Sequence, residues 1–171
     1  MTNGGAPDSF GDFYAAEFNG LLRFMFKHGA DWHDAFDACQ DAFLEALPRW
    51  QAIDNPRAWV RTTAYRAYLK RRARFAEDER RMSRADWAPR PAFDKLEIPE
   101  EEARVLRLFA SLPPRQRQVL AWHYDGYSNI EIAKILGLTD KAVAANLYQA
   151  RQGLKRLLSE NGEDGSAGGA R

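Results

Sequence analysis

The stretch SNIEIAKILGLTDKAVAANLYQARQGLKRLL, residues 128–158, decides the fold of the C-terminal half of this chain. Ser128, followed three residues later by Glu131, is typical of a capping box, in which each side chain satisfies a free backbone amide at the start of a helix. Gly137 can take the left-handed conformation that ends this helix, and Thr139 can cap a second one. Two short helices joined by such a turn form a helix-turn-helix, whose second helix ordinarily lies in the DNA major groove.

Apolar residues give each of these helices one inward face. The expected inward residues are Ile132, Ile135 and Leu136 in the first helix, beside a small Ala133, and Val143, Leu147, Leu154, Leu157 and Leu158 in the second. Two more helices are predicted upstream. One opens at Glu100 with Ala103, Leu106, Phe109 and Ala110 inward, and the next runs from the Leu112-Pro113-Pro114 turn to Gly126. The C-terminal domain is therefore expected to hold four helices.

Three helices are predicted in the N-terminal half. Aromatic and aliphatic residues recur at steps of three and four from Phe10 to Phe26, with Asp8 or Ser9 before them and Gly29 after them. A second helix is expected near Asp31. It has Trp32, Phe36, Cys39 and Phe43 on one side, Ala35, Ala38, Ala42 and Ala46 on a flatter side, and Pro48 at its end. Asn55 and Pro56 are a strong start signal for a third helix.

The third helix is unusually basic. Its cations are Arg57, Arg61, Arg66, Lys70, Arg71, Arg72 and Arg74, and they are interleaved with Trp59, Tyr65 and Tyr68. Cations can neutralise phosphates while exposed aromatic rings stack on unpaired bases, which is how proteins hold single strands. A solvated basic face with structural aromatic residues explains the same composition. Trp59 is expected to be partly in the core.

The fold class predicted is all-α, with two small helical domains joined by a linker. The domains are expected over residues 8–75 and 99–158. Residues 76–98 mix both charges with three prolines and are predicted to be the linker, and residues 159–171 to be a disordered tail. Trp87 and Phe93 are apolar for a linker and are expected to dock either on a domain or on a partner.

The composition argues against several classes of protein. A lone Cys39, no charged leader before an apolar core and no window of membrane-span length favour a cytoplasmic protein with no membrane partner. The three histidines, His28, His33 and His123, are not spaced as metal ligands. No Gly-rich phosphate loop or catalytic triad stands out, so no catalytic residue, metal or cofactor is expected.

The chain resembles a known family, the bacterial extracytoplasmic-function (ECF) sigma factors, over residues 10–75 and 100–158. LPPRQRQVLAWHYDGYSNIEIAKILGL is similar to the family's C-terminal signature. AFDACQDAFLEAL matches its pattern through Asp37, Gln40, Phe43 and Leu44, and NPRAWVRTTAYRAYLKRRAR resembles its proline-started basic helix. The ordered set of stretches is more specific than any one of them.

This resemblance implies a sigma factor that binds core RNA polymerase and promoter DNA and directs initiation, often under a cognate anti-sigma factor. Polymerase is expected to contact Asp37, Gln40, Asp41 and Phe43 through the flat face of the second helix. The promoter −10 element is assigned to Arg57, Trp59, Arg61, Arg66, Lys70, Arg71 and Arg72. The −35 element is assigned to Arg115, Arg117 and Ser128 and, on a recognition helix over residues 141–151, to Lys141, Ala144, Asn146, Tyr148, Gln149 and Arg151.

Several positions depart from the family pattern. The −10 helix has Arg66 and Lys70 where Asn and Asp are usual, and the recognition helix has Ala144, Asn146 and Gln149 at positions that are usually basic. Fewer phosphate contacts weaken DNA binding, although Asn and Gln can still read adenine. Two alternatives stay open: a helix-turn-helix regulator that binds operator DNA without polymerase, and a degenerate sigma-like protein that acts through protein interaction.

Overall fold

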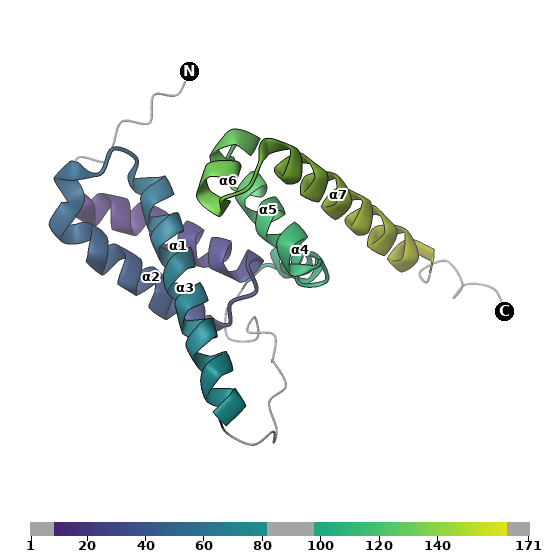
Figure 1. Cartoon of the computed structure of the whole chain (residues 1–171), viewed down its shortest axis with the longest axis horizontal. Helices are drawn as coiled ribbons and strands as arrows, with labels where there is room; N and C mark the ends of the chain where they lie inside the picture. The colour runs from purple at the N-terminus through teal and green to yellow at the C-terminus, as the bar shows by residue number, and fades with distance from the viewer. Residues whose placement is uncertain (1–8, 82–97, 164–171) are drawn as a thin grey trace. The chain divides into compact units, whose positions relative to one another are not determined.

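The computed structural model describes residues 9–81 and 98–163. Its contacts divide the chain into two compact units, Met1–Glu97 and Ile98–Arg171. The first unit contains α1 (Phe10–Lys27), α2 (Trp32–Ala46), a 3-10 helix η1 (Leu47–Ala52) and α3 (Pro56–Arg81) (Figure 1). The second contains α4 (Glu100–Ala110), α5 (Pro114–Tyr124), α6 (Asn129–Leu136) and α7 (Asp140–Glu163). The predicted all-α class is confirmed.

Side-chain caps start the helices of the first unit where the sequence places them. The hydroxyl of Ser9 accepts a hydrogen bond from the Asp12 amide at 3.1 Å, and Asp8 lies outside the described residues. Asp31 caps α2 in the same way at 2.8 Å, and Asn55 caps α3 at 3.1 Å. These bonds satisfy amides that have no partner within the helix, and they fix the three starting points of the bundle.

Aromatic rings from α1 and α2 form one cluster in the first unit. Phe43 of α2 lies at its centre, and its ring centroid is 4.8 Å from Tyr14, 5.8 Å from Phe13 and 6.0 Å from Phe18. Phe43 is only 2% exposed. Rings at these separations add packing energy beyond the burial of their surface, so the cluster holds the two helices together.

The alanine side of α2 is buried rather than available to a partner. Ala35, Ala38, Ala42 and Ala46 have no exposed surface. Side chains this small allow close approach, and α2 makes its most extensive contacts with α3. The expectation that this flat face binds polymerase is therefore wrong, because the face belongs to the core of the unit.

The capping box and the glycine turn of the second unit form as predicted. The Ser128 hydroxyl accepts from the Glu131 amide, and the Glu131 carboxylate accepts from the Ser128 amide at 2.8 Å. Hydrogen bonds that the Glu131 carboxylate accepts from the Ser128 hydroxyl and from the Ser128 amide lower the pKa of Glu131. Gly137 has a φ of 64° at the end of α6, and the Thr139 hydroxyl accepts from the Ala142 amide at 3.1 Å. The turn between α6 and α7 is thus fixed at both ends.

The core of the second unit agrees with most of the predicted inward residues. The buried set includes Ala103, Leu106, Phe109, Ile132, Ala133, Val143 and Leu147, joined by Trp122 and Ala150. Ala110 and Leu158 are exposed, so their assignment to the inward face is wrong. Both lie at the ends of apolar stripes, where neighbouring helices no longer cover them.

Two predicted boundaries are also wrong. The helix α3 continues to Arg81, into the stretch predicted to be a linker from residue 76, and α7 continues to Glu163, into the predicted tail. In both cases polar and charged residues without an apolar stripe still propagate an existing helix, since the nucleation cost has already been met. Residues 82–97, with Trp87 and Phe93, and residues 164–171 lie outside the described residues.

We expect Ser128→Ala to lower the free energy of unfolding of the second unit by about 1 kcal/mol, because α6 loses its N-terminal cap. Differential scanning calorimetry should show a lower transition temperature for this unit, by roughly 4–8 °C. Ser159→Ala, near the C-terminal end of α7, is the matched control and should cost less than about 0.5 kcal/mol. Equal effects of the two substitutions would contradict the role given to the cap.

Candidate functional site

An acidic row on α2 forms the first candidate surface. Asp37 and Asp41 are 57% and 51% exposed, and Gln40 between them is half-buried. Nη1 of Arg71, from α3, lies 2.6 Å from Oδ2 of Asp37, and Nη2 lies 2.7 Å from Oδ2 of Asp41. The structure therefore brings together residues that the sequence assigns to two different sites.

Phe43 is not part of this surface. Its ring fills the aromatic cluster of the core, so its assignment to polymerase binding is wrong. The residues that the sequence reasoning missed are Leu44 and Leu47, which are 66% and 53% exposed. Leu44 follows Asp37 and Asp41 at helical spacing of four and three, which puts all three residues on one face. That spacing was the available signal.

Two of the cations assigned to DNA have structural partners. Arg61 is 1% exposed, and its Nη1 lies 3.0 Å from Oε2 of Glu17 in α1. Nε of Arg57 lies 3.5 Å from the same oxygen. The assignment of Arg61 to the −10 element is wrong, because a side chain buried in this ion pair cannot reach a DNA strand without breaking the unit.

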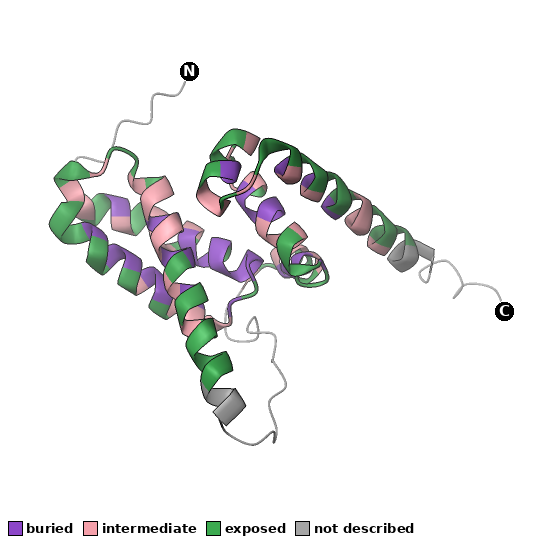
Figure 2. Ribbon diagram, viewed as in Figure 1, coloured by how far each residue is buried: buried purple, intermediate pink, exposed green. Residues whose placement is uncertain are grey.

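The aromatic residues of α3 also differ from the expectation. Tyr65 and Tyr68 are buried, so they cannot stack on unpaired bases. Trp59 is half-buried, as predicted. The ring that faces solvent is Phe75, at 62%, in the second half of the helix, which Figure 2 shows as mostly exposed. Its position beyond the last packed turn was not visible in the sequence pattern.

Exposed cations remain on α3 from Arg66 onward. Arg66, Lys70 and Arg72 are exposed. Arg72 stays close to its own helix, with its guanidinium carbon 5.8 Å from the centre of the Tyr68 ring. Arg66 and Lys70 make no ion pair within residues 9–81. Among the cations assigned to the −10 element, these three can meet phosphates without dismantling other contacts, and Arg74 on the same helix is likewise exposed.

The outer face of α7 forms another candidate surface. Lys141, Ala144 and Tyr148 are exposed, and Tyr148 reaches 64%. The side-chain amide nitrogen of Asn146 instead donates to the Ala142 carbonyl of the same helix at 2.8 Å. Arg151 contacts Nε2 of His123 at 3.0 Å. The face therefore offers one exposed ammonium, a methyl group and a phenol near its start.

The other residues assigned to the −35 element lie on α5 and at the start of α6. Arg115 is exposed and donates to Gln118 at 2.8 Å, while Arg117 is half-buried. Ser128 is exposed, but its hydroxyl and amide are engaged in the capping box. Arg115 is thus the most accessible of the three.

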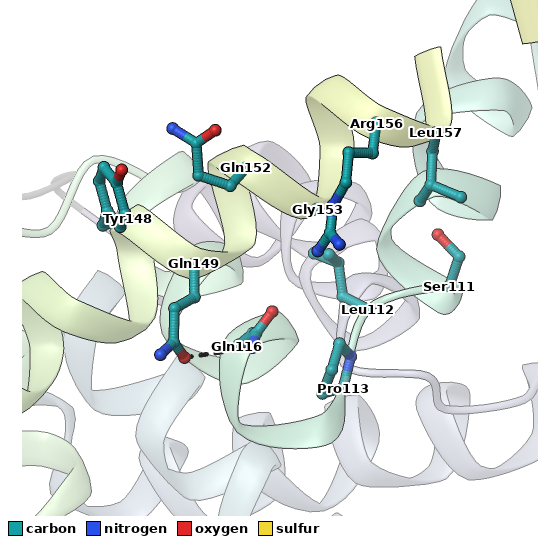
Figure 3. A pocket seen from close by; sticks show the side chains of 10 residues that line it. All are labelled: Ser111, Leu112, Pro113, Gln116, Tyr148, Gln149, Gln152, Gly153, Arg156 and Leu157. Atoms are coloured by element: carbon teal, nitrogen blue, oxygen red, sulfur yellow. Dashed lines mark hydrogen bonds between the residues drawn. The ribbon is translucent and has the colours of Figure 1, made fainter. Parts of the chain in front are cut away.

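A groove runs beside α7 in the second unit (Figure 3). It is lined by Ser111, Leu112, Pro113, Gln116, Tyr148, Gln149, Gln152, Gly153, Arg156 and Leu157. Gln116 donates to Gln149 at 3.3 Å across the groove. A side chain at Gly153 would meet Leu112 at 3.3 Å, so the glycine allows α7 to approach the turn before α5. Gln149 is therefore already partnered on this side.

The described ranges carry neither a metal-binding cluster nor a membrane-spanning helix. Residues 9–81 and 98–163 contain no group of three or more His, Cys, Asp or Glu side chains that could hold a metal ion. Burial raises the pKa of the Cys39 thiol to about 12, which keeps it protonated and unreactive at neutral pH. No helix of these ranges is long and apolar enough to cross a membrane.

Comparisons with known families identify both units. Residues 13–76 match Sigma-70 region 2, and residues 102–154 match Sigma-70, region 4. The two matches follow in order and together cover more than half of the chain. This chain belongs to the sigma-70 family.

Relatives of this sigma factor support the predicted ECF class. It is 26% identical to the probable RNA polymerase sigma factor RfaY of Xanthomonas campestris pv. campestris over 97% of its own length, but it spans only 44% of that relative. It is 23% identical to the RNA polymerase sigma factor YlaC of Bacillus subtilis, with 92% of this chain and 96% of YlaC covered.

Solved structures similar to this sigma factor were determined with protein partners. CnrH in complex with the cytosolic domain of CnrY gives a TM-score of 0.59 at 27% identity, with 88% of each chain covered. The sigma factor RpoE with the anti-sigma factor NepR, from Bartonella quintana, gives 0.63 at 20% identity, covering 88% of this chain and 96% of that one. At this level of identity, the similarity to RpoE shows a shared fold and nothing more.

We expect Arg61→Ala to lower the free energy of unfolding of the first unit by about 2 to 3 kcal/mol, since it leaves a gap in the core and removes a partner of Glu17. Urea denaturation followed by circular dichroism measures this loss. Arg66→Ala, at an exposed site on the same helix, should change stability by no more than about 0.5 kcal/mol. A mild effect of Arg61→Ala would restore Arg61 as a candidate DNA contact.

Proposed function

We propose that this sigma factor binds core RNA polymerase and directs it to promoters by contacting a −10 and a −35 element. The ordered match to regions 2 and 4 is the observation that carries the proposal. A chain with both regions can contact polymerase and two promoter elements. The protein supplies no chemistry of its own and acts in the cytoplasm.

Polymerase is proposed to bind the face of α2 that carries Asp37, Gln40, Asp41 and Leu44. Two half-exposed carboxylates attract basic side chains of a partner, and the exposed Leu44 gives the centre of the contact an apolar group. The alanine side and Phe43 are excluded because both are buried.

The −10 strand is proposed to lie along α3 from Arg66 to Phe75. Arg66, Lys70 and Arg72 would meet its phosphates, and the exposed ring of Phe75 is available for stacking. Separating bases costs a few kcal/mol of stacking per step, which phosphate pairing and ring stacking offset.

The −35 duplex is proposed to receive α7 in its major groove. Lys141 would meet a phosphate near the start of the helix, and the Ala144 methyl group can contact a thymine methyl. With so few cations on this face, the −35 contact alone is expected to be weak. Tight binding therefore depends on polymerase holding both units near the promoter.

Regulation by an anti-sigma factor is proposed from the likeness to CnrH, whose structure includes a cytosolic domain of CnrY. A second candidate function is a degenerate member that binds polymerase or such an antagonist without directing initiation. The exposed alanines of α7 favour it. Run-off transcription separates the two, because the degenerate member forms the polymerase complex and yields no transcript.

A gel shift distinguishes the proposed sigma factor from an operator-binding regulator that works without polymerase. The regulator shifts duplex DNA alone. The sigma factor is expected to need core polymerase for a tight shift, and core polymerase with this chain should select promoters from a pool of genomic fragments.

We expect Asp37→Asn together with Gln40→Ala to weaken binding to core polymerase by at least about tenfold, because hydrogen-bonded charges at an interface are costly to lose. Fluorescence anisotropy of the labelled chain gives the Kd. Asp54→Asn, at an exposed carboxylate of the same unit, is the control and should leave the Kd within about twofold. Equal Kd values for all variants would remove α2 from the interface.

We expect Ala144→Lys to tighten binding of the holoenzyme to promoter duplex, since it adds a cation to the exposed face of α7. The slope of log Kd against log salt should steepen by about one. Ala110→Lys places the same charge on α4 and should leave the slope unchanged. A similar slope change for both variants would mean that the added charge acts through the net charge of the protein rather than through α7.

A further inference from the structure

Arg71 lies on the basic helix, yet its guanidinium points to the acidic row. Each terminal nitrogen is bonded to a different carboxylate of α2, at 2.6 Å to Asp37 and 2.7 Å to Asp41. The Arg71 side chain is 29% exposed. A planar guanidinium that donates to two fixed carboxylates is strongly held. Turning it toward a DNA phosphate would break both hydrogen bonds.

The acidic row needs a cation from outside its own helix. Asp37 and Asp41 are one turn apart, and like charges at this spacing repel each other. Asp34 precedes Asp37 on α2. Burial raises the pKa of Asp34, and the charges of Asp31 and Asp37 raise it further, while the charges of Arg71 and Arg72 lower it. Arg71 therefore offsets the repulsion within the row and restricts the rotation of two carboxylates.

Both carboxylates keep an exposed side. Each uses Oδ2 for Arg71, and each is more than half exposed, so the other oxygen can accept from a partner. An interface that finds its side chains already oriented avoids the entropic cost of ordering them.

We infer that Arg71 is a positioning residue, which holds Asp37 and Asp41 in the arrangement that core polymerase meets and which does not contact the promoter strand. This inference rests on the proposed function. It deepens that function by assigning Arg71 to the polymerase surface instead of the DNA surface.

The neighbouring Arg72 is a matched comparison. It has the same charge and is exposed, and its Nη1 donates within α3, to the Tyr68 hydroxyl at 3.4 Å. Removal of Arg72 therefore takes a cation from the same turn without releasing either carboxylate of the acidic row.

The test measures two quantities for each variant of the full chain: the Kd for core polymerase and the lifetime of the open complex at saturating polymerase. Arg71→Ala should raise the Kd about tenfold, with Arg71→Lys between it and the unmodified chain, because an ammonium cannot bridge both carboxylates in the same way. At saturation its open complex should keep the normal lifetime. Arg72→Ala should show the reverse: an unchanged Kd and a shortened lifetime.

A spectroscopic measurement tests the ion pair without polymerase. In the free chain, NMR should show slow rotation of the Arg71 guanidinium, which is lost when Asp37→Asn and Asp41→Asn are combined. Fast rotation in the unmodified chain would overturn the inference. So would an unchanged or lower Kd for Arg71→Ala, or a loss confined to the open complex. If the unmodified chain does not bind core polymerase, the proposed function fails, and the NMR signal alone decides whether Arg71 holds the row.

Discussion

Close packing of α2 on α3 is the constraint on which the surfaces of the first unit depend. The alanine side of α2 has no exposed surface, and α2 makes its most extensive contacts with α3. Once that side is buried, the rotation of α2 about its axis is set. Asp37 and Asp41 must then emerge beside α3, within reach of Arg71. The position of the acidic row is thus a consequence of core packing.

The second unit is organised by a turn rather than by a packed face. The helix α6 has only eight residues, and helices this short are marginal without caps. Its start is closed by Ser128 and Glu131, and its end by Gly137 in the left-handed conformation. These local bonds set the angle at which α7 leaves, and hence the face that α7 exposes from Lys141 to Tyr148.

Local features of the fold could be read from the sequence, while contacts between distant helices could not. Caps such as Asn55 and Ser128 act within three residues, so their spacing reveals them. The apolar stripes likewise gave the cores of both units. The ends of α3 and α7 were missed because an established helix continues through charged residues that carry no stripe of their own.

The candidate site was predicted less well for the same reason. Phe43 and Arg61 fit the family pattern by position, but burial depends on how helices are rotated against each other. The bond of Arg71 to α2 spans 30 residues or more of sequence. No spacing rule connects residues at that distance. Only the packed structure shows that Arg71 of the basic helix α3 pairs with carboxylates of α2.

The division of α3 follows from these contacts. Its first half supplies core residues and the buried ion pair with Glu17, while residues 72–77 in its second half are exposed. Charge alone does not distinguish the halves, since arginines occur in both. A cation of α3 is held within the unit where a carboxylate from α1 or α2 lies within reach, as for Arg61 and Arg71. The number of cations that α3 can offer a DNA strand is therefore set by its neighbours, and it is smaller than the composition of the helix suggests.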